Sequence, residues 1–207
     1  MSLQSNDRRY RLGFIGGGKL AGSVIRGLVR AKFCKPDEIL AGEPNESARL
    51  GLGKELGISV TAENAEVAEK AELILIGVKP GMVLQVIEQL EAAIVRKLVI
   101  SLAAGIRLMS MEERAKARFM RAMTNTPAAV CQAATALARG VRTTDQDLAR
   151  AREIFSAIGF VVEVEEEQID AVTALAGSGP AFVYTVIEAL AAGGTSCGLP
   201  ASLKPRL

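Results

Sequence analysis

The sequence predicts an α/β fold, with a mainly parallel sheet covered by helices on both faces and followed by the start of an all-helical segment. Short apolar runs alternate with amphipathic helical patterns as far as about residue 164. A glycine-rich turn follows the first of these runs, and the composition becomes almost wholly helical and apolar after residue 169. We therefore expect two parts, residues 1–164 and residues 165–207.

The glycine-rich turn identifies the type of sheet. Apolar residues 12–15 lead into Gly-Gly-Gly-Lys-Leu-Ala at 16–21, and apolar residues then recur at helical spacing. A strand, G-x-G-x-x-A and a helix form the fingerprint of a Rossmann domain, which binds a dinucleotide. In this pattern Gly16 permits the tight turn, Gly18 lets the backbone approach a pyrophosphate, and Ala21 lets the helix pack close to the strand. A glycine-rich turn in any α/β protein is the alternative.

An acidic residue, Glu43, follows the second apolar run at residues 38–42. At this position of a Rossmann domain an acid usually hydrogen-bonds the adenosine ribose and favours NADH over NADPH. A solvated loop glutamate is the alternative. Arg49 complicates the choice, because its guanidinium could meet a 2′-phosphate. The cofactor is therefore expected to be NADPH or NADH.

Two further runs end at the expected carboxyl edge of the sheet, where ligands bind in such folds. Residues 71–78 form a near-continuous apolar run, which is typical of a parallel strand buried on both faces. The run ends at Lys79, a candidate ligand contact or a plain surface lysine, and Pro80 begins a helix. The run 97–102 leads into small residues at 103–105, against which a flat group could lie.

The remaining pattern continues the alternation. We expect helices at 46–56, 64–70, 80–94, 107–117 and 145–157, and strands at 58–60, 118–123, 133–138 and 160–164. From residue 169 the chain is helical, with one expected break at 177–180. The helix that begins at Pro180 is too apolar to stand alone in water, so it needs another domain or another chain as its partner.

Composition restricts the class of protein. The 207 residues carry a net charge of +2 with acids and bases interspersed, so no basic surface for nucleic acid is expected. No apolar run approaches the length of a membrane span, and residues 1–11 lack the apolar stretch of a secretory signal. Three cysteines without paired spacing and the absence of histidine argue against a metal site and indicate a reducing compartment. We expect a cytoplasmic protein without a membrane or nucleic-acid partner.

Four stretches together resemble the pyrroline-5-carboxylate reductase family, namely GFIGGGKLAG at 13–22, GVKP at 77–80, MTNTPA at 123–128 and DAVTALAGSGPAF at 170–182. The resemblance runs from about residue 10 to residue 200. It implies a Rossmann domain over 1–164, a helical dimerisation domain from 165 to 207, and a homo-oligomer joined through the C-terminal helices. It also implies the reaction, which is NAD(P)H-dependent reduction of (S)-1-pyrroline-5-carboxylate to L-proline, the last step of proline biosynthesis.

The resemblance further implies which residues form the site. Those at the cofactor, from the pyrophosphate and adenosine to the nicotinamide, are Gly16, Gly18, Lys19, Leu20, Glu43, Asn45, Asn64, Val78, Lys79, Pro80, Ala103 and Ala104. Those nearest the substrate are Asn125, Glu166 and Ser178. Glu166 is expected to stabilise the cationic imine, with a water or a hydroxyl as the alternative, and the helix start at Ser178 is expected to hold the substrate carboxylate. Because the imine nitrogen can carry its proton before the hydride arrives, no histidine is required.

The chain departs from the family in two ways. The family's serine-proline-glycine-glycine-threonine-threonine loop and the helices that carry it do not occur in the sequence, and Glu43 stands where relatives often have a small hydroxyl residue. The second departure favours NADH. The first leaves a truncated, nucleotide-binding homologue as an alternative, inactive alone or active only with complete subunits. Another Rossmann imine or β-hydroxyacid reductase is a further alternative, which the MTNTP and GSGPA segments oppose.

Overall fold

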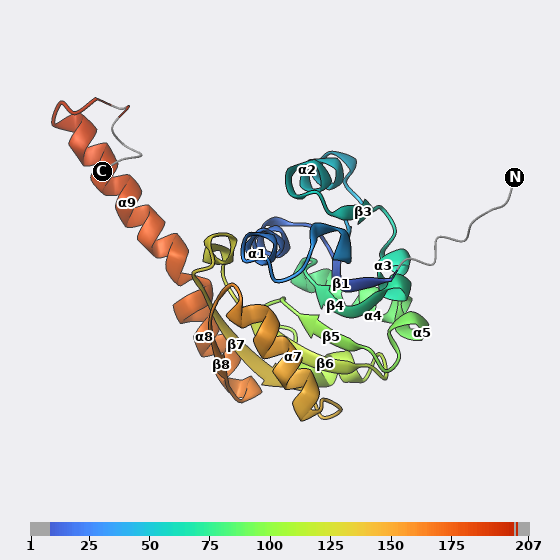
Figure 1. Ribbon diagram of the computed structural model, residues 1–207. Helices are drawn as coiled ribbons and strands as arrows, with labels where there is room; N and C mark the ends of the chain where they lie inside the picture. The colour runs from blue at the N-terminus through green and yellow to red at the C-terminus, as the bar shows by residue number, and fades with distance from the viewer. Residues whose placement is uncertain (1–8, 201, 203–207) are drawn as a thin grey trace, which may run out of the picture.

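The computed structural model describes residues 9–200 and residue 202, and its core is one eight-stranded sheet (Figure 1). The strand order is β3-β2-β1-β4-β5-β6-β7-β8, and of the paired neighbours only β6 and β7 are antiparallel. This confirms the predicted α/β class. The strands are β1 Tyr10–Ile15, β2 Ile39–Gly42, β3 Ser59–Thr61, β4 Ala71–Ile76, β5 Leu98–Ser101, β6 Arg118–Met123, β7 Ala133–Arg139 and β8 Gly159–Glu163.

Helices cover both faces of this sheet, α1 and α7 on one face and α3, α4, α6 and α8 on the other (Figure 1). The α-helices are α1 Lys19–Arg30, α2 Glu46–Leu56, α3 Asn64–Lys70, α4 Val83–Gln89, α5 Glu91–Ile94, α6 Leu108–Glu112, α7 Asp145–Ser156, α8 Ile169–Val172 and α9 Gly179–Ser196. Short 3₁₀ turns are η1 Pro36–Glu38, η2 Pro80–Met82, η3 Thr126–Val130 and η4 Glu166–Gln168, and η5 Thr173–Gly177 is a π-helical turn.

Strand β4 shows why an apolar run forms the middle of the sheet. Leu73 and Leu75 are buried in the core under α1 and α7, whereas Ile74 and Ile76 are buried in the core under α3 and α4. Glu72 is the exposed residue of the strand and lies near its beginning. An unbroken apolar sequence is therefore required, because successive side chains enter opposite and equally dry cores.

Two predicted helices differ from the observed ones. The expected helix 80–94 is divided into η2, α4 and α5, since Leu90, with φ −106° and ψ 6°, ends one helix and begins the next. The expected helix 107–117 ends already at Glu112, because the chain must turn back to enter β6 at Arg118. Neither difference moves a strand end, so the carboxyl edge of the sheet is unaffected.

The expected break at 177–180 is confirmed at Ser178, a bend with φ −88° and ψ −25° between the π-helical turn η5, which ends at Gly177, and α9, which begins at Gly179. Pro180 has no N–H, and its ring conflicts with the carbonyl four residues earlier. The wider π turn accommodates this conflict, so that Ser178 alone departs from the helical pattern between Glu166 and Ser196.

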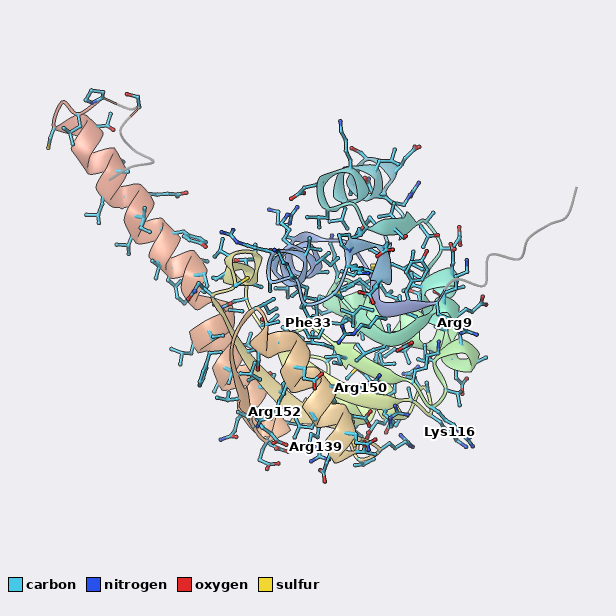
Figure 2. All side chains as sticks on the ribbon, viewed as in Figure 1. Arg9, Phe33, Lys116, Arg139, Arg150 and Arg152 are labelled. Carbon is cyan, nitrogen blue, oxygen red and sulfur yellow. The ribbon has the colours of Figure 1, made fainter. Side chains whose placement is uncertain are left out.

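Helix α9 projects away from the body formed by the sheet (Figure 1). Its side chains stand clear of that body along the length of the helix (Figure 2), and Phe182, Tyr184 and Leu190 are 65%, 52% and 72% exposed. The stretch Glu166–Ser196 is also long and apolar enough to cross a membrane, by length and composition alone, so the expectation that no apolar run approaches this length is wrong. An apolar helix that residues 9–200 and 202 leave uncovered requires a further surface to pack against.

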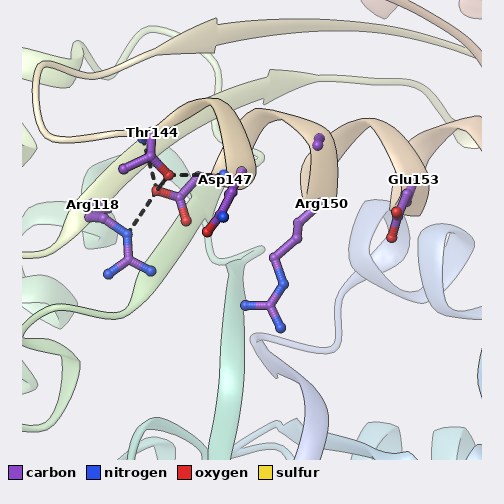
Figure 3. Close-up of a pocket in the computed structure, with 7 residues that line it drawn as sticks. Arg118, Thr144, Asp147, Arg150 and Glu153 are labelled. Carbon is purple, nitrogen blue, oxygen red and sulfur yellow. Dashed lines mark hydrogen bonds and ion pairs between the residues drawn. The ribbon is translucent and has the colours of Figure 1, made fainter.

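Asp147 fixes the first turn of α7 to β6 (Figure 3). Its carboxylate accepts hydrogen bonds from Arg118 Nε at 2.8 Å, from Thr144 N at 2.9 Å and from Thr144 Oγ1 at 2.9 Å. Burial opposes ionisation of this group, but the three hydrogen bonds outweigh burial and hold the pKa of Asp147 below its ordinary value. The folded state therefore stabilises the ionised carboxylate.

We expect Asp147→Asn to lower the free energy of unfolding by about 2 kcal/mol at neutral pH, because it leaves Arg118 and Thr144 without a charged acceptor. The folded pKa is depressed, so this stabilisation is complete above the unfolded pKa and is lost as the pH falls through the folded pKa. Urea unfolding at neutral and acid pH measures both effects. Asp145→Asn is the matched control, since that carboxylate is 96% exposed. Equal losses in the free energy of unfolding for the two variants would contradict the stabilising role given to the Asp147 carboxylate.

Candidate functional site

The glycine-rich turn lies between the ends of β1 and β4. Gly16 has φ +93°, and a Cβ at this residue would lie 2.9 Å from backbone atoms of Gly77 and Val78. Gly77 faces α1 in turn, where a Cβ would lie 2.6 Å from Ala21 Cβ. These small residues let β1, β4 and α1 approach closely, which is the geometry that the dinucleotide fingerprint requires.

The beginning of α1 is open to a ligand. Gly18, the N-cap, has φ −64°, and apart from its chain neighbours no atom of residues 9–200 and 202 lies within 4 Å of the position its Cβ would take. No side chain caps this helix and no acid occupies its first turn. Free N–H groups, the helix dipole and the exposed Lys19 therefore all favour an anion here. The turn fits the pyrophosphate of a dinucleotide.

A cleft of about 520 Å³ opens beside this turn, at the carboxyl ends of β4, β5 and β6. The predicted residues that line it are Gly18, Lys19, Leu20, Val78, Lys79, Pro80, Ala103, Ala104, Asn125 and Ser178. Gly16 is buried beneath the turn. Sequence reasoning missed several lining residues, which are Gly77, Leu102, Met123, Thr124, Thr126, Thr173 and Gly177. All but Met123 and Thr173 adjoin predicted residues in the chain.

The helical segment forms the wall of the cleft opposite the glycine turn. Thr173, Gly177 and Ser178 contribute to it, all from or directly after the π turn. Ser178 N donates to Thr173 O at 2.9 Å, so these two residues lie above one another on the same side of the helix. This five-residue spacing is the signal that could have identified Thr173.

Glu43 lies at the adenosine end, held beside the glycine turn. Its Oε2 accepts from Gly17 N at 3.0 Å and its Oε1 accepts from Asn45 N at 3.0 Å. Arg49 does not neutralise this carboxylate directly, because its Nη1 donates to the backbone oxygens of Glu43 and Pro44 at 2.9 and 3.2 Å. The site therefore presents a fixed negative charge at the end of β2.

The two predicted asparagines at this end have different roles. Asn45 caps α2, since its Oδ1 accepts from Ala48 N at 2.9 Å. Asn64 Oδ1 lies beside Gly42 at the end of β2 and is buried without a hydrogen-bond partner among residues 9–200 and 202. A buried acceptor without a donor costs about 1–3 kcal/mol. Asn64 therefore fits a donor brought by a ligand, such as a ribose hydroxyl.

The structure does not bring Glu166 into the cleft. Its Oε1 accepts from Leu108 N at 2.6 Å and from Arg121 Nη1 at 3.2 Å, and Arg121 is 3% exposed. Glu166 lies at the beginning of the helical segment Glu166–Ser196, about three turns before Ser178. The geometry gives no support to the predicted role of Glu166 in stabilising an imine; the residue instead ties the segment to the sheet.

The glycine turn, the strand order with β1 between β2 and β4, and the cleft together define a Rossmann domain that binds a dinucleotide. Comparisons with known proteins identify the family. Residues 11–105 match the family described as NADP oxidoreductase coenzyme F420-dependent, and residues 166–206 match pyrroline-5-carboxylate reductase dimerisation. The pyrroline-5-carboxylate reductase of Glycine max is 41% identical over 196 residues, which are 94% of this chain and 72% of that protein. The chain belongs to the pyrroline-5-carboxylate reductase family.

Other relatives agree. The enzyme of a Synechocystis strain is 41% identical over 198 residues, covering 95% of this chain and 74% of its own length. The Plasmodium falciparum pyrroline carboxylate reductase structure with NADP bound has a TM-score of 0.86 at 26% identity, covering 94% of this chain and 72% of that one. The Coxiella burnetii pyrroline-5-carboxylate reductase structure has a TM-score of 0.81 at 30% identity, covering 95% of this chain and 74% of that one.

These findings place the chain among NAD(P)H-dependent oxidoreductases that act on a C=N bond, in the final step of proline biosynthesis. The alternative of an unrelated Rossmann reductase is set aside. A 3-hydroxyisobutyrate dehydrogenase of Mycobacterium tuberculosis shares the fold, with a TM-score of 0.66, but only 16% of its sequence. The dimerisation match and the family's small-molecule chemistry also indicate a homo-oligomer with a small-molecule substrate.

Proposed function

We propose that the cleft between the glycine turn and Ser178 is where this chain reduces (S)-1-pyrroline-5-carboxylate to L-proline. The observation that carries the proposal is the arrangement of one cleft, with an anion-binding turn on one wall and a helix start on the other. Gly18 and Lys19 would hold the pyrophosphate of a bound dinucleotide, and Ala103 and Ala104 would lie beside its nicotinamide. The proposed division into a Rossmann domain, 1–164, and a helical domain from 165 is supported by the dimerisation match at 166–206.

The cofactor, when bound, supplies a hydride to the imine carbon. The residues of this chain bind and orient it. Lys19 and the N–H groups at the start of α1 hold the pyrophosphate. Residues 78–80 line the path from there, and the small side chains of Ala103 and Ala104 leave room for a flat ring. The backbone thus fixes the distance between the ring and the second wall, which is the principal contribution that positioning makes to the rate.

The helix start at Ser178 faces the substrate. Ser178 N and Ala181 N donate within the helical segment and Pro180 has no N–H, so the Ser178 hydroxyl is the group at this helix start that is suited to the substrate carboxylate. The residues that line the cleft include no acid in the part of the chain that the structure describes, so hydroxyl groups rather than a carboxylate face the protonated imine. Thr173 Oγ1 donates to Ile169 O at 2.8 Å, which leaves its lone pairs free to accept from an iminium N–H.

The adenosine end supports a preference for NADH. The Glu43 carboxylate lies at the end of β2, where it can accept a hydrogen bond from the 2′-hydroxyl of NADH, whereas the 2′-phosphate of NADPH would meet a like charge. Asn64 is proposed to accept from the same ribose.

The oligomer is proposed to form through α9. Its apolar residues are exposed on all sides, and the dimerisation family matches this segment. A helix of this kind is covered by a second copy in a homo-oligomer, which we place in the cytoplasm. Under the alternative, the chain binds nucleotide but needs complete subunits for turnover.

Oxidation of NADH and NADPH in the presence of pyrroline-5-carboxylate tests the proposal directly. We expect loss of the reduced-nicotinamide absorbance to match L-proline formation, in a sample whose mass by light scattering is that of a dimer or larger. Saturable dinucleotide binding without proline formation, at every protein concentration tested, would favour the nucleotide-binding alternative. Turnover by a monomer would contradict the role given to α9.

A further inference from the structure

We propose that Asn125 is a positioning residue, which sets the helix start at Ser178 across the cofactor cleft, and not a ligand of the substrate. The inference rests on the proposed function of this cleft. It follows from the hydrogen bond between Asn125 and Ala176 in the π turn, and from the missing N–H of Pro180 in the first turn of α9.

Pro180 creates the need for an outside donor. In a regular helix the N–H of residue 180 would donate to the carbonyl of Ala176, but proline has no N–H. The next amide, Ala181 N, donates to Ser178 O at 3.0 Å instead. The Ala176 carbonyl is thus turned out of the helix ladder at the point where the π turn ends.

Asn125 supplies that donor from the chain that follows β6. Its Nδ2 donates to Ala176 O at 3.0 Å, and its Oδ1 accepts from Ala134 N at 3.2 Å. The residue is 8% exposed. One side chain therefore joins the end of β6, the start of β7 and the π turn, and both ends of its amide serve the protein itself.

A second attachment fixes the beginning of the same helical segment, Glu166–Ser196. There Glu166 accepts from Arg121 Nη1 and Leu108 N, which hold the segment to the sheet. Asn125 holds the segment beside the cleft, because its partner Ala176 lies two residues before Ser178. With one end fixed by Glu166, the bond to Ala176 determines how far Ser178 and Thr173 lie from the cofactor wall.

Hydrogen exchange on the dinucleotide-loaded protein tests the bond without relying on turnover. Asn125→Asp keeps the size of the side chain and the acceptor for Ala134 N, but removes the donor to Ala176 O. We expect backbone amides in residues 173–181 to exchange about 10-fold faster, with α7 unchanged. Gln132→Glu, the same amide-to-acid change at an exposed residue nearby, is the matched control. Unchanged exchange in residues 173–181 would overturn the proposal.

A rescue variant separates the bond from a general loss of structure. Pro180→Ala returns a backbone N–H that can reach Ala176 O, so combining it with Asn125→Asp should restore slow exchange in residues 173–181. Failure of this rescue, with α7 still protected, would contradict the assignment of Ala176 as the group that Asn125 serves.

Steady-state kinetics distinguish positioning from substrate binding. For Asn125→Asp we expect kcat to fall about 10- to 100-fold, while KM for the imine and Kd for NADH change less than about threefold. A large rise in KM at unchanged kcat would make Asn125 a substrate ligand and overturn the proposal. A wild-type chain that forms no proline would defeat the proposed function, whereas the exchange measurements would still decide the role of Asn125.

Discussion

Gly18→Ala is expected to weaken dinucleotide binding by about 30- to 100-fold while leaving the stability of the fold unchanged. The backbone at Gly18, with φ −64°, accepts an alanine, and apart from its chain neighbours no atom of residues 9–200 and 202 lies within 4 Å of the added methyl group. The methyl group instead fills the space through which a pyrophosphate reaches the N–H groups of α1. Fluorescence titration with NADH measures the affinity, and urea unfolding measures the stability.

Two further glycine variants make this result specific. Gly16→Ala should lower stability, since Gly16 has φ +93° and its Cβ would lie 2.9 Å from rigid backbone atoms. Gly51→Ala, in the middle of α2 with open space around it, should bind NADH as the wild type does. It should unfold at a slightly higher urea concentration, because alanine favours a helix more than glycine does. Wild-type affinity in Gly18→Ala would show that the dinucleotide does not lie over this turn.

Glu43→Gln is expected to strengthen NADPH binding by about 10- to 100-fold and to weaken NADH binding several-fold. Two unit charges 4 Å apart interact by about 4 kcal/mol at an effective dielectric of 20, and solvent at this open site reduces that to roughly 1.4–2.8 kcal/mol. The Glu43 carboxylate is held in place by the N–H groups of Gly17 and Asn45, so it cannot swing away from a 2′-phosphate without losing both hydrogen bonds. Parallel titrations with the two coenzymes give the ratio.

Glu46→Gln is the control for this change. It removes the same charge from an exposed residue in the first turn of α2, close to Glu43 in the chain. Its ratio of NADH to NADPH affinity should stay within about threefold of the wild-type ratio. If Glu43→Gln left the ratio unchanged, the negative charge at the end of β2 would not decide the coenzyme.

The sheet could be predicted from the sequence because its signals are local. The apolar run 71–76 indicates the length and the burial of β4. The glycines at 16–18 indicate the close approach between β1, β4 and α1. The antiparallel pairing of β7 could not be read in this way. Nothing in residues 133–139 distinguishes a strand that runs against its neighbour from one that runs with it, since direction depends on the long-range path of the chain.

The site was predictable where a residue acts through its backbone or its place at a strand end. Gly18, Lys79 and Ala103 are examples, because the fold fixes their position whatever surrounds them. Glu166 shows the limit. Its acidic side chain suits an imine, but the buried Arg121 and the amide of Leu108, both distant in the chain, take its carboxylate. The hydrogen bond from Asn125 to Ala176 O was missed for a related reason, since the two residues are distant in the chain.

The position of transferred deuterium tests the central claim most directly. The protein is mixed with pyrroline-5-carboxylate and NADH deuterated at C4 of the nicotinamide, and the proline formed is analysed by mass spectrometry and NMR. Our account predicts L-proline carrying one deuterium on the ring carbon that was double-bonded to nitrogen, with Gly18→Ala forming it more slowly at limiting NADH. Saturation of the protein with either coenzyme and no labelled proline would contradict the account.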